Sequence, residues 1–241
     1  MASLSVIRAE VERRLPGALT VYRRSEIELF PTGLAILDEQ IGGIPRSALT
    51  QICASSDISS GKRTLLVSLM AQVTRRGQFC SLVDASDGFD PISAEAAGVN
   101  LSRLLWVRCG GKKRLRPLEQ AFKAADILVQ NGGFSVIAVD LGAVDERQLK
   151  KVPLTTWFRF ARVMERTPSA LVFLMPYPAA QSCAGLTLHL SCAKPGWTQA
   201  MAVSHGRLLT ELNFEAEIGR ARLRKPVQSA RPRFSASSMW G

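Results

Sequence analysis

The sequence predicts an α/β fold, in which helices flank a mostly parallel sheet and an antiparallel extension follows at the C-terminal end. Between residues 48 and 175, apolar runs of strand length alternate with segments whose apolar residues recur at helical spacing. This alternation is typical of a parallel sheet covered on both faces. After about residue 185, three apolar–polar alternating segments follow one another with no helical pattern between them, which favours antiparallel strands.

Turns rich in glycine and proline mark the elements before residue 100. Residues 4–15 have the spacing of an amphipathic helix, which Pro16 and Gly17 end. Two turns, at 30–33 and 42–45, enclose a short helix whose apolar residues are followed by Asp38. The predicted elements that come next are a strand at 48–53, a helix at 61–76, a strand at 79–83 and a short helix at 91–97.

The alternation continues to residue 175 and then changes. The predicted elements are strands at 104–107, 135–139 and 170–175, helices at 118–129 and 154–166, and antiparallel segments at 186–191, 199–204 and 207–212. From residue 225 the chain is basic and rich in proline and serine, which predicts disorder. We therefore divide the chain into an N-terminal helix and linker (1–25), a core (26–224) and a disordered basic tail (225–241).

Composition excludes several classes of protein. The chain has 241 residues, of which 46% are hydrophobic and 21% charged, so it can bury a sizeable core and is not a low-complexity chain. We find neither an apolar run long enough for a membrane helix nor a secretory signal, and we expect a cytoplasmic protein. The five cysteines form no C-x-x-C pair, which favours reduced thiols over disulfides or a metal site.

The net charge of +11 indicates an anionic partner, such as nucleic acid, a nucleotide or an acidic protein surface. The densest basic stretch lies between two predicted elements. It contains Arg108, Lys112, Lys113, Arg114 and Arg116. This stretch is a candidate contact for DNA phosphates, and a solvated loop is the alternative interpretation.

A degenerate phosphate loop lies between the predicted strand at 48–53 and the helix at 61–76. Gly61 and Lys62 match the end of the pattern G-x-x-x-x-G-K-[ST], whereas Ser56 replaces the first glycine. Arg63 stands where the hydroxyl ligand of Mg²⁺ is expected, and a guanidinium cannot ligate a metal ion. The candidate nucleotide-binding residues of this loop are Ser59, Ser60, Gly61, Lys62 and Arg63. The alternative is an ordinary strand-to-helix loop with a solvated lysine.

Asp140 adds a further candidate to the same site. It ends the apolar run Val136–Val139, at the position where nucleotide-hydrolysing phosphate-loop proteins hold Mg²⁺. A carboxylate that caps the following turn is the alternative. ATP and Mg²⁺ are therefore open as cofactors.

Taken in order, these stretches resemble the RecA recombinase core over roughly residues 26–212. The resemblance is carried by Phe30–Gly33, Leu37-Asp38, Gly42–Pro45, Ser59–Lys62, Val83–Ala85, Phe89–Pro91, Gly98–Leu101, Leu104-Leu105 and Val136–Asp140. It implies a RecA-like phosphate-loop core with a site for ATP and Mg²⁺.

The chain departs from that family at positions that matter for catalysis. The resemblance implies a catalytic Glu two residues after Asp84, where Ser86 stands, and a phosphate-sensing Gln where Pro176 stands. Ser86 cannot act as a general base. Both DNA-binding loops of the family look shortened, after Asp140 and at 177–185. We therefore assign no catalytic residue and doubt hydrolysis, although residual ATP binding stays open.

A RecA-like core with these losses resembles the ImuA family of accessory proteins in bacterial damage-induced mutagenesis. That resemblance implies a role in translesion synthesis and in the SOS response to DNA damage, through contacts with an error-prone polymerase complex and with RecA. Two alternatives remain. One is a divergent DNA-dependent ATPase that uses Lys62 and Asp140, with Asp87 as a substitute base, and the other is a SulA-like inhibitor of cell division.

Two terminal segments are candidate partner-binding surfaces. The apolar stripe of the N-terminal helix, Val6, Ile7, Val11 and Leu15, can dock on a second copy of the chain or on RecA, or fold back on its own core. In the tail, Trp240 is an isolated aromatic side chain that can anchor in a partner's pocket, and a functionless terminus is the alternative.

Overall fold

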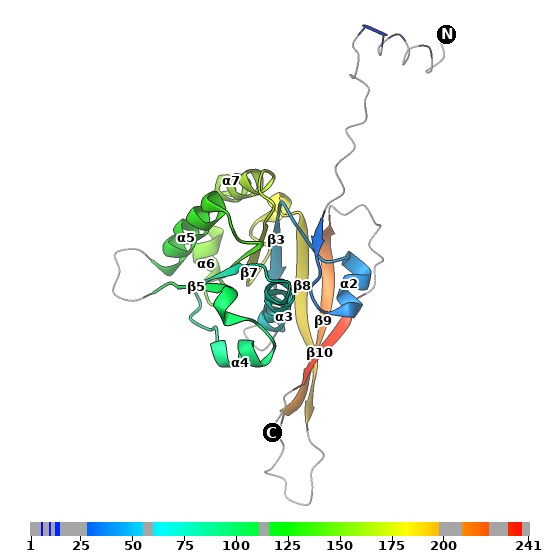
Figure 1. Cartoon of the computed structure of the whole chain (residues 1–241), viewed down its shortest axis with the longest axis vertical. Coiled ribbons are helices and arrows are strands. Elements are labelled where there is room, and N and C mark those ends of the chain that lie inside the picture. The colour runs from blue at the N-terminus through cyan, green and yellow to red at the C-terminus, as the bar shows by residue number, and fades with distance from the viewer. Residues whose placement is uncertain are drawn as a thin grey trace, which may run out of the picture.

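The computed structural model describes residues 6, 10, 13–14, 28–54, 60–110, 116–197, 209–221 and 231–237. Its centre is an eight-stranded sheet with the order β10-β9-β8-β3-β7-β6-β4-β5 (Figure 1). The strands are β3 (Ala48–Cys53), β4 (Cys80–Asp84), β5 (Leu104–Arg108), β6 (Val136–Asp140), β7 (Ala170–Met175), β8 (Leu186–Trp197), β9 (Leu209–Ala221) and β10 (Arg233–Ser237). All pairs from β5 to β8 are parallel and the β8–β9 pair is antiparallel, as the sequence predicts. β10 also pairs antiparallel with β9.

Helices cover both faces of this sheet, and each face has its own hydrophobic cluster. One cluster packs α2 (Ala35–Ile41), α3 (Lys62–Arg75) and α4 (Pro91–Ala96) against the sheet. The other contains residues of α5 (Pro117–Asn131), α6 (Glu146–Lys150) and α7 (Leu154–Met164), which lie together in Figure 1. Trp157, at 1% exposure, packs edge-on against Phe122 and Phe173 in this second cluster. The parallel α/β architecture with flanking helices is confirmed.

The segment before the sheet is fixed by one carboxylate. Asp38 of α2 accepts hydrogen bonds from the backbone N–H and hydroxyl of Thr32 and from the N–H of Gly33. The turn at 42–45 contains β2 (Ile44–Pro45), which pairs with β1 (Leu29–Phe30) in a small second sheet. The spacing of threonine, glycine and aspartate in this stretch is therefore explained by a closed local hydrogen-bond set.

The antiparallel extension is longer than the sequence analysis expects. β8 lies parallel to β3 through its first residues and pairs with β9 along a long hairpin that contains three register shifts. β9 continues to Ala221 rather than ending at residue 212. The alternation of Leu212, Phe214 and Ala216 with acidic and amide side chains continues past that point, and it is the signal that the shorter prediction missed. The predicted strand at 199–204 lies outside the described residues.

Two further elements correct the sequence analysis. Arg233–Ser237 of the predicted disordered tail forms β10, because the apolar side chain of Phe234 is buried against Phe214 of β9, with ring centroids 5.2 Å apart. The short helix α6 was not expected. Its N-cap is Asp145, whose carboxylate accepts a hydrogen bond from the N–H of Arg147. The linker through residue 25 lies outside the described residues.

The five cysteines are free, as the sequence predicts, and four of them are buried. Burial raises the pKa of the Cys53 thiol to about 12, an effect that the positive charge of Lys62 opposes, and burial also raises the pKa of Cys80 to about 12. Both therefore stay protonated near neutral pH, and the thiolate is the reactive form. None of the described helices is long and apolar enough to span a membrane.

We expect one thiol, that of the partly exposed Cys192, to react first when the native protein is titrated with a disulfide reagent. The other thiols are expected to react on denaturation. Counting the released chromophore before and after adding denaturant measures both phases. Rapid reaction of Cys53 or Cys80 in the native protein, located by peptide mapping, would contradict the buried positions of these thiols.

Candidate phosphate-binding site

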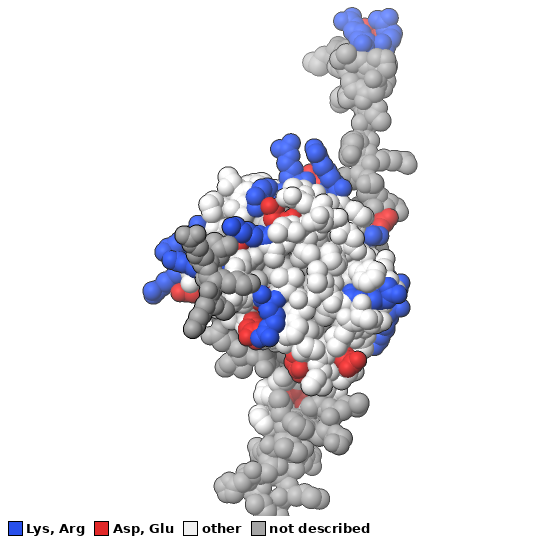
Figure 2. All heavy atoms as spheres, turned by 60° about the vertical axis from the view of Figure 1, so that its left-hand side comes forward, with Lys and Arg blue, Asp and Glu red and all other residues white. Residues whose placement is uncertain are grey.

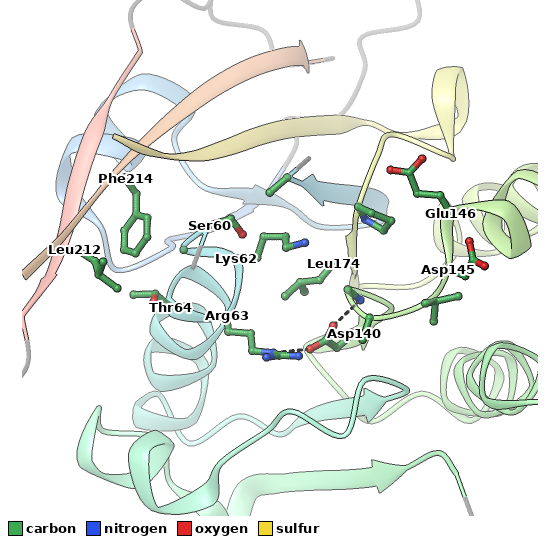
Figure 3. Close-up of a pocket in the computed structure, with 16 residues that line it drawn as sticks. Ser60, Lys62, Arg63, Thr64, Asp140, Asp145, Glu146, Leu174, Leu212 and Phe214 are labelled. Atoms are coloured by element: carbon green, nitrogen blue, oxygen red, sulfur yellow. Dashed lines mark hydrogen bonds and ion pairs between the residues drawn. The ribbon is translucent and has the colours of Figure 1, made fainter. Parts of the chain in front are cut away.

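A cleft of about 890 Å³ lies at the carboxyl ends of the central strands, beside the N-terminus of α3. Lys62, Arg63, Asp140 and Phe214 all line it, and they come from three different elements (Figure 3). The segment that follows β6, residues 142–146, forms the opposite wall. The carboxyl ends of parallel strands meet at one edge of a sheet, so this is the edge where ligands of α/β proteins bind.

The helix α3 begins at Gly61, which has the left-handed φ of +77°. A side chain there would meet the ring of Phe214, since a Cβ atom on Gly61 would lie 2.7 Å from that ring. Lys62 follows as the first helical residue, and its ammonium group donates a hydrogen bond to the carbonyl of Met175, at 3.3 Å. The start of α3 therefore presents a lysine at a helix N-terminus, where backbone N–H groups favour anions.

Arg63 and Asp140 form an ion pair across the cleft. The Nε–H of Arg63 donates to Oδ2 of Asp140 at 2.9 Å. The Asp140 side chain is 6% exposed, whereas that of Arg63 is 51% exposed. The position that the family resemblance gives to a metal-binding hydroxyl thus holds a cation that contacts the expected metal-binding carboxylate directly (Figure 3).

Ser86 is bonded to the same carboxylate. Its hydroxyl donates to Oδ1 of Asp140 at 2.9 Å and accepts a hydrogen bond from the N–H of Ala143 at 2.9 Å. Gly142 donates its N–H to the same Oδ1 at 2.8 Å. The residue that replaces the expected catalytic Glu therefore positions Asp140 and the segment after β6.

The loop after β4 is shaped by Asp84, which is fully buried. Its carboxylate accepts hydrogen bonds from the backbone N–H groups of Ser86, Gly88 and Phe89. Asp87, in the same loop, forms an exposed ion pair with Arg108 and is not among the described residues that line the cleft. The structure therefore does not place Asp87 where a substitute general base would be needed.

The structure brings some of the predicted site residues together and separates others. Ser60, Gly61, Lys62, Arg63 and Asp140 line one cleft, and Ser59 lies outside the described residues. Arg108 ends β5, and Arg116 precedes α5 as an exposed residue. The remaining predicted basic contacts, Lys112, Lys113 and Arg114, lie outside the described residues. On the face that Figure 2 presents, Lys and Arg lie in separate groups with Asp and Glu beside them.

The predicted partner surfaces fall mostly outside the described part of the chain. Val6 is helical and 58% exposed, while Ile7, Val11, Leu15 and Trp240 lie outside the described residues. Sequence reasoning also missed Gly142 and Phe214 as parts of the cleft. Phe214 approaches Gly61 only through the long β8–β9 hairpin, and no local motif marks it.

The residues present do not fit a magnesium ion at Asp140. Both carboxylate oxygens already accept hydrogen bonds, from Arg63 on one oxygen and from Ser86 and Gly142 on the other. Magnesium needs oxygen ligands in a near-octahedral arrangement, and Arg63 supplies none. In the described part of the chain, no group of three or more His, Cys, Asp or Glu side chains is placed to hold a metal ion.

The strand order, the helix that starts at Gly61 and Lys62, and the acidic end of β6 together define a phosphate-loop protein of the α/β class. Comparison with known protein families identifies the family within this class. Residues 10–148 match the family described as "RecA N-terminal domain", and the chain belongs to that family.

Curated relatives with the name "Protein RecA" support this membership. The RecA of Methylococcus capsulatus is 38% identical over 117 residues, which cover 48% of this chain and 31% of that protein. The RecA of Ectopseudomonas oleovorans is 36% identical over 141 residues, which cover 58% of this chain and 38% of that protein. The chain therefore spans about a third of the length of these relatives.

Proposed function

We propose that this chain is a RecA-like accessory protein that supports damage-induced translesion synthesis through protein–protein contacts and does not hydrolyse ATP. The observation that carries the proposal is the closed network around Asp140. Arg63 and Ser86, at the two positions where the family places a metal-binding hydroxyl and a catalytic Glu, both bond to this carboxylate. Without a free carboxylate for the metal and a general base for water, hydrolysis loses two of its required groups.

The family match supplies the RecA-like core of this proposal. Residues 10–148 match the RecA N-terminal domain, and the curated relatives are named RecA. The resemblance to the ImuA family supplies the context of translesion synthesis in the cytoplasm. The partners that we propose are an error-prone polymerase complex and RecA, with DNA contacted through the basic residues 108–116.

A divergent DNA-dependent ATPase is the second candidate, because Lys62 lies at the N-terminus of α3 in a cleft large enough for a nucleotide. The two candidate functions predict different rates of ATP hydrolysis. We expect the purified protein to release no phosphate from ATP above the background of Lys62→Ala, with or without Mg²⁺ and single-stranded DNA. Turnover that requires Lys62 and is stimulated by DNA would overturn the accessory proposal in favour of the ATPase.

The cellular role needs its own experiment. We expect deletion of the gene in the source organism to lower the frequency of mutations induced by ultraviolet light, and the intact gene to restore it. Spontaneous mutation frequency and recombination frequency are the controls, and both are expected to stay unchanged. An unchanged induced frequency would refute the role in translesion synthesis, and filamentous cells on overexpression would favour the division inhibitor.

A further inference from the structure

We infer that the cleft binds the polyphosphate chain of a nucleotide without a divalent cation, because the guanidinium of Arg63 takes the place of the metal. This inference rests on the proposed function only in treating the cleft as non-hydrolytic. Three groups of observations support it: the hydrogen bonds of Asp140, the packing of Arg63, and the two basic residues at the N-terminus of α3.

Each carboxylate oxygen of Asp140 already accepts a hydrogen bond from the protein. Its Oδ2 accepts from Arg63 at 2.9 Å, and its Oδ1 accepts from Ser86 at 2.9 Å and Gly142 at 2.8 Å. A carboxylate has two acceptor oxygens with about four lone-pair sites. Three donors occupy three of these sites, and the remaining site lies on the oxygen that contacts Arg63. A metal ion there would meet the like charge of the guanidinium.

Arg63 is held in its position from a second side. A Cβ atom placed on Gly88 would lie 2.2 Å from Nη2 of Arg63 and 2.4 Å from its Cζ. The guanidinium therefore lies directly against the backbone of the loop after β4. The N–H of Gly88 is in turn bonded to the buried Asp84 at 3.3 Å. A cation fixed between Asp140 and this loop is preorganised and does not have to be recruited from solution.

The residues at the start of α3 favour a phosphate chain. Lys62 and Arg63 are adjacent at the N-terminus of α3, and both line the cleft. On the opposite wall, Glu146 pairs with Lys150 at 3.1 Å, and Asp145 accepts a hydrogen bond from the N–H of Arg147. The dipole of α3 and the backbone N–H groups of its first turn add to the attraction of Lys62 and Arg63 for an anion.

The first test measures ATP binding by the full chain in EDTA and in excess MgCl₂ by calorimetric titration. We expect the two dissociation constants to agree within about twofold, which corresponds to a binding free-energy difference below 1 kcal/mol. Inorganic tripolyphosphate is expected to compete with ATP under both conditions. An increase of about tenfold or more in ATP affinity on adding Mg²⁺ would overturn the inference, and so would the absence of binding.

Point variants then test whether Arg63 itself contributes to ATP binding. Arg63→Thr is expected to weaken ATP binding in EDTA by about tenfold, because the built-in cation is lost, and MgCl₂ should restore part of the loss. Arg159→Thr removes an exposed arginine of α7 outside the cleft and is the matched control, with affinity unchanged. Equal affinity of Arg63→Thr and the native chain in EDTA would refute the role of Arg63. If Arg63→Thr does not fold, the ATP affinities of the native chain in EDTA and in MgCl₂ still test whether binding is independent of the metal.

The two proposals fail in different ways. Failure to bind ATP overturns the metal-independent site and leaves the accessory role intact, because that role depends on partner contacts. Phosphate release that depends on Lys62 overturns the accessory role. If that release proceeds only with Mg²⁺, and Mg²⁺ also tightens ATP binding, both proposals are wrong.

Discussion

Replacing Phe214 with alanine is expected to lower the free energy of unfolding by about 3–5 kcal/mol, the usual cost of emptying a large buried aromatic site. Phe214 is 1% exposed, packs against Phe234 of β10 and covers the backbone of Gly61 at the start of α3. Its loss removes the support of β10 and of the α3 N-terminus together. Urea denaturation followed by circular dichroism measures the change as a lower midpoint at a similar slope.

Phe158→Ala is the matched control for this prediction. Phe158 lies on α7 and is 53% exposed, so its truncation leaves a much smaller cavity, and we expect a change within about 1 kcal/mol. A loss in Phe214→Ala no larger than that of the control would contradict the packing of β9 against the start of α3.

Asp84→Ala is expected to destabilise the protein by roughly 3 kcal/mol or more, because three backbone N–H groups lose a charged acceptor inside the fold. The loop of residues 86–89 then loses the bonds that hold it against β4. Arg63 packs on Gly88 of this loop, so the variant should also weaken ATP binding in EDTA. Thermal unfolding and calorimetric titration measure the two effects.

Asp87→Ala is the control that tests whether the losses of stability and of ATP binding are specific to the buried carboxylate of Asp84. Asp87 lies three residues away, is 59% exposed and forms a surface ion pair with Arg108, which is worth about 0–1 kcal/mol. We expect its stability and ATP binding to stay close to those of the native chain. If Asp87→Ala abolished an ATP-dependent activity, the idea of a substitute base would return, and the assignment of Asp87 to a surface pair would be wrong.

Much of the fold could be predicted because its signals are local. The alternating pattern from residue 48 to 175 places strands and helices close to where they occur, and the spacing from Thr32 to Asp38 corresponds to one closed hydrogen-bond set. The strand at 233–237 could not be found in this way. A basic, serine-rich segment becomes a strand only because β9 offers it an edge and Phe214 a partner ring.

The sequence could predict which residues belong to the candidate site, but not how they contact one another. It showed that Asp140 matches the family pattern and that Arg63 and Ser86 depart from it. Their bonds depend on side-chain reach across two strands: β4 and β6 pair in register so that Asp84 lies beside Asp140, which brings Ser86 within 2.9 Å of the carboxylate. Spacing along the chain does not contain this information, because Arg63 and Asp140 are 77 residues apart.

The closed network around Asp140 also constrains how this chain can change over generations. Arg63→Thr alone would leave a buried carboxylate without its cation, and Ser86→Glu alone would bring a second carboxylate against it. Each of these single substitutions therefore gives a less stable protein. A metal-dependent site at Asp140 would require at least two coordinated substitutions, so single mutations of this chain are not expected to produce one.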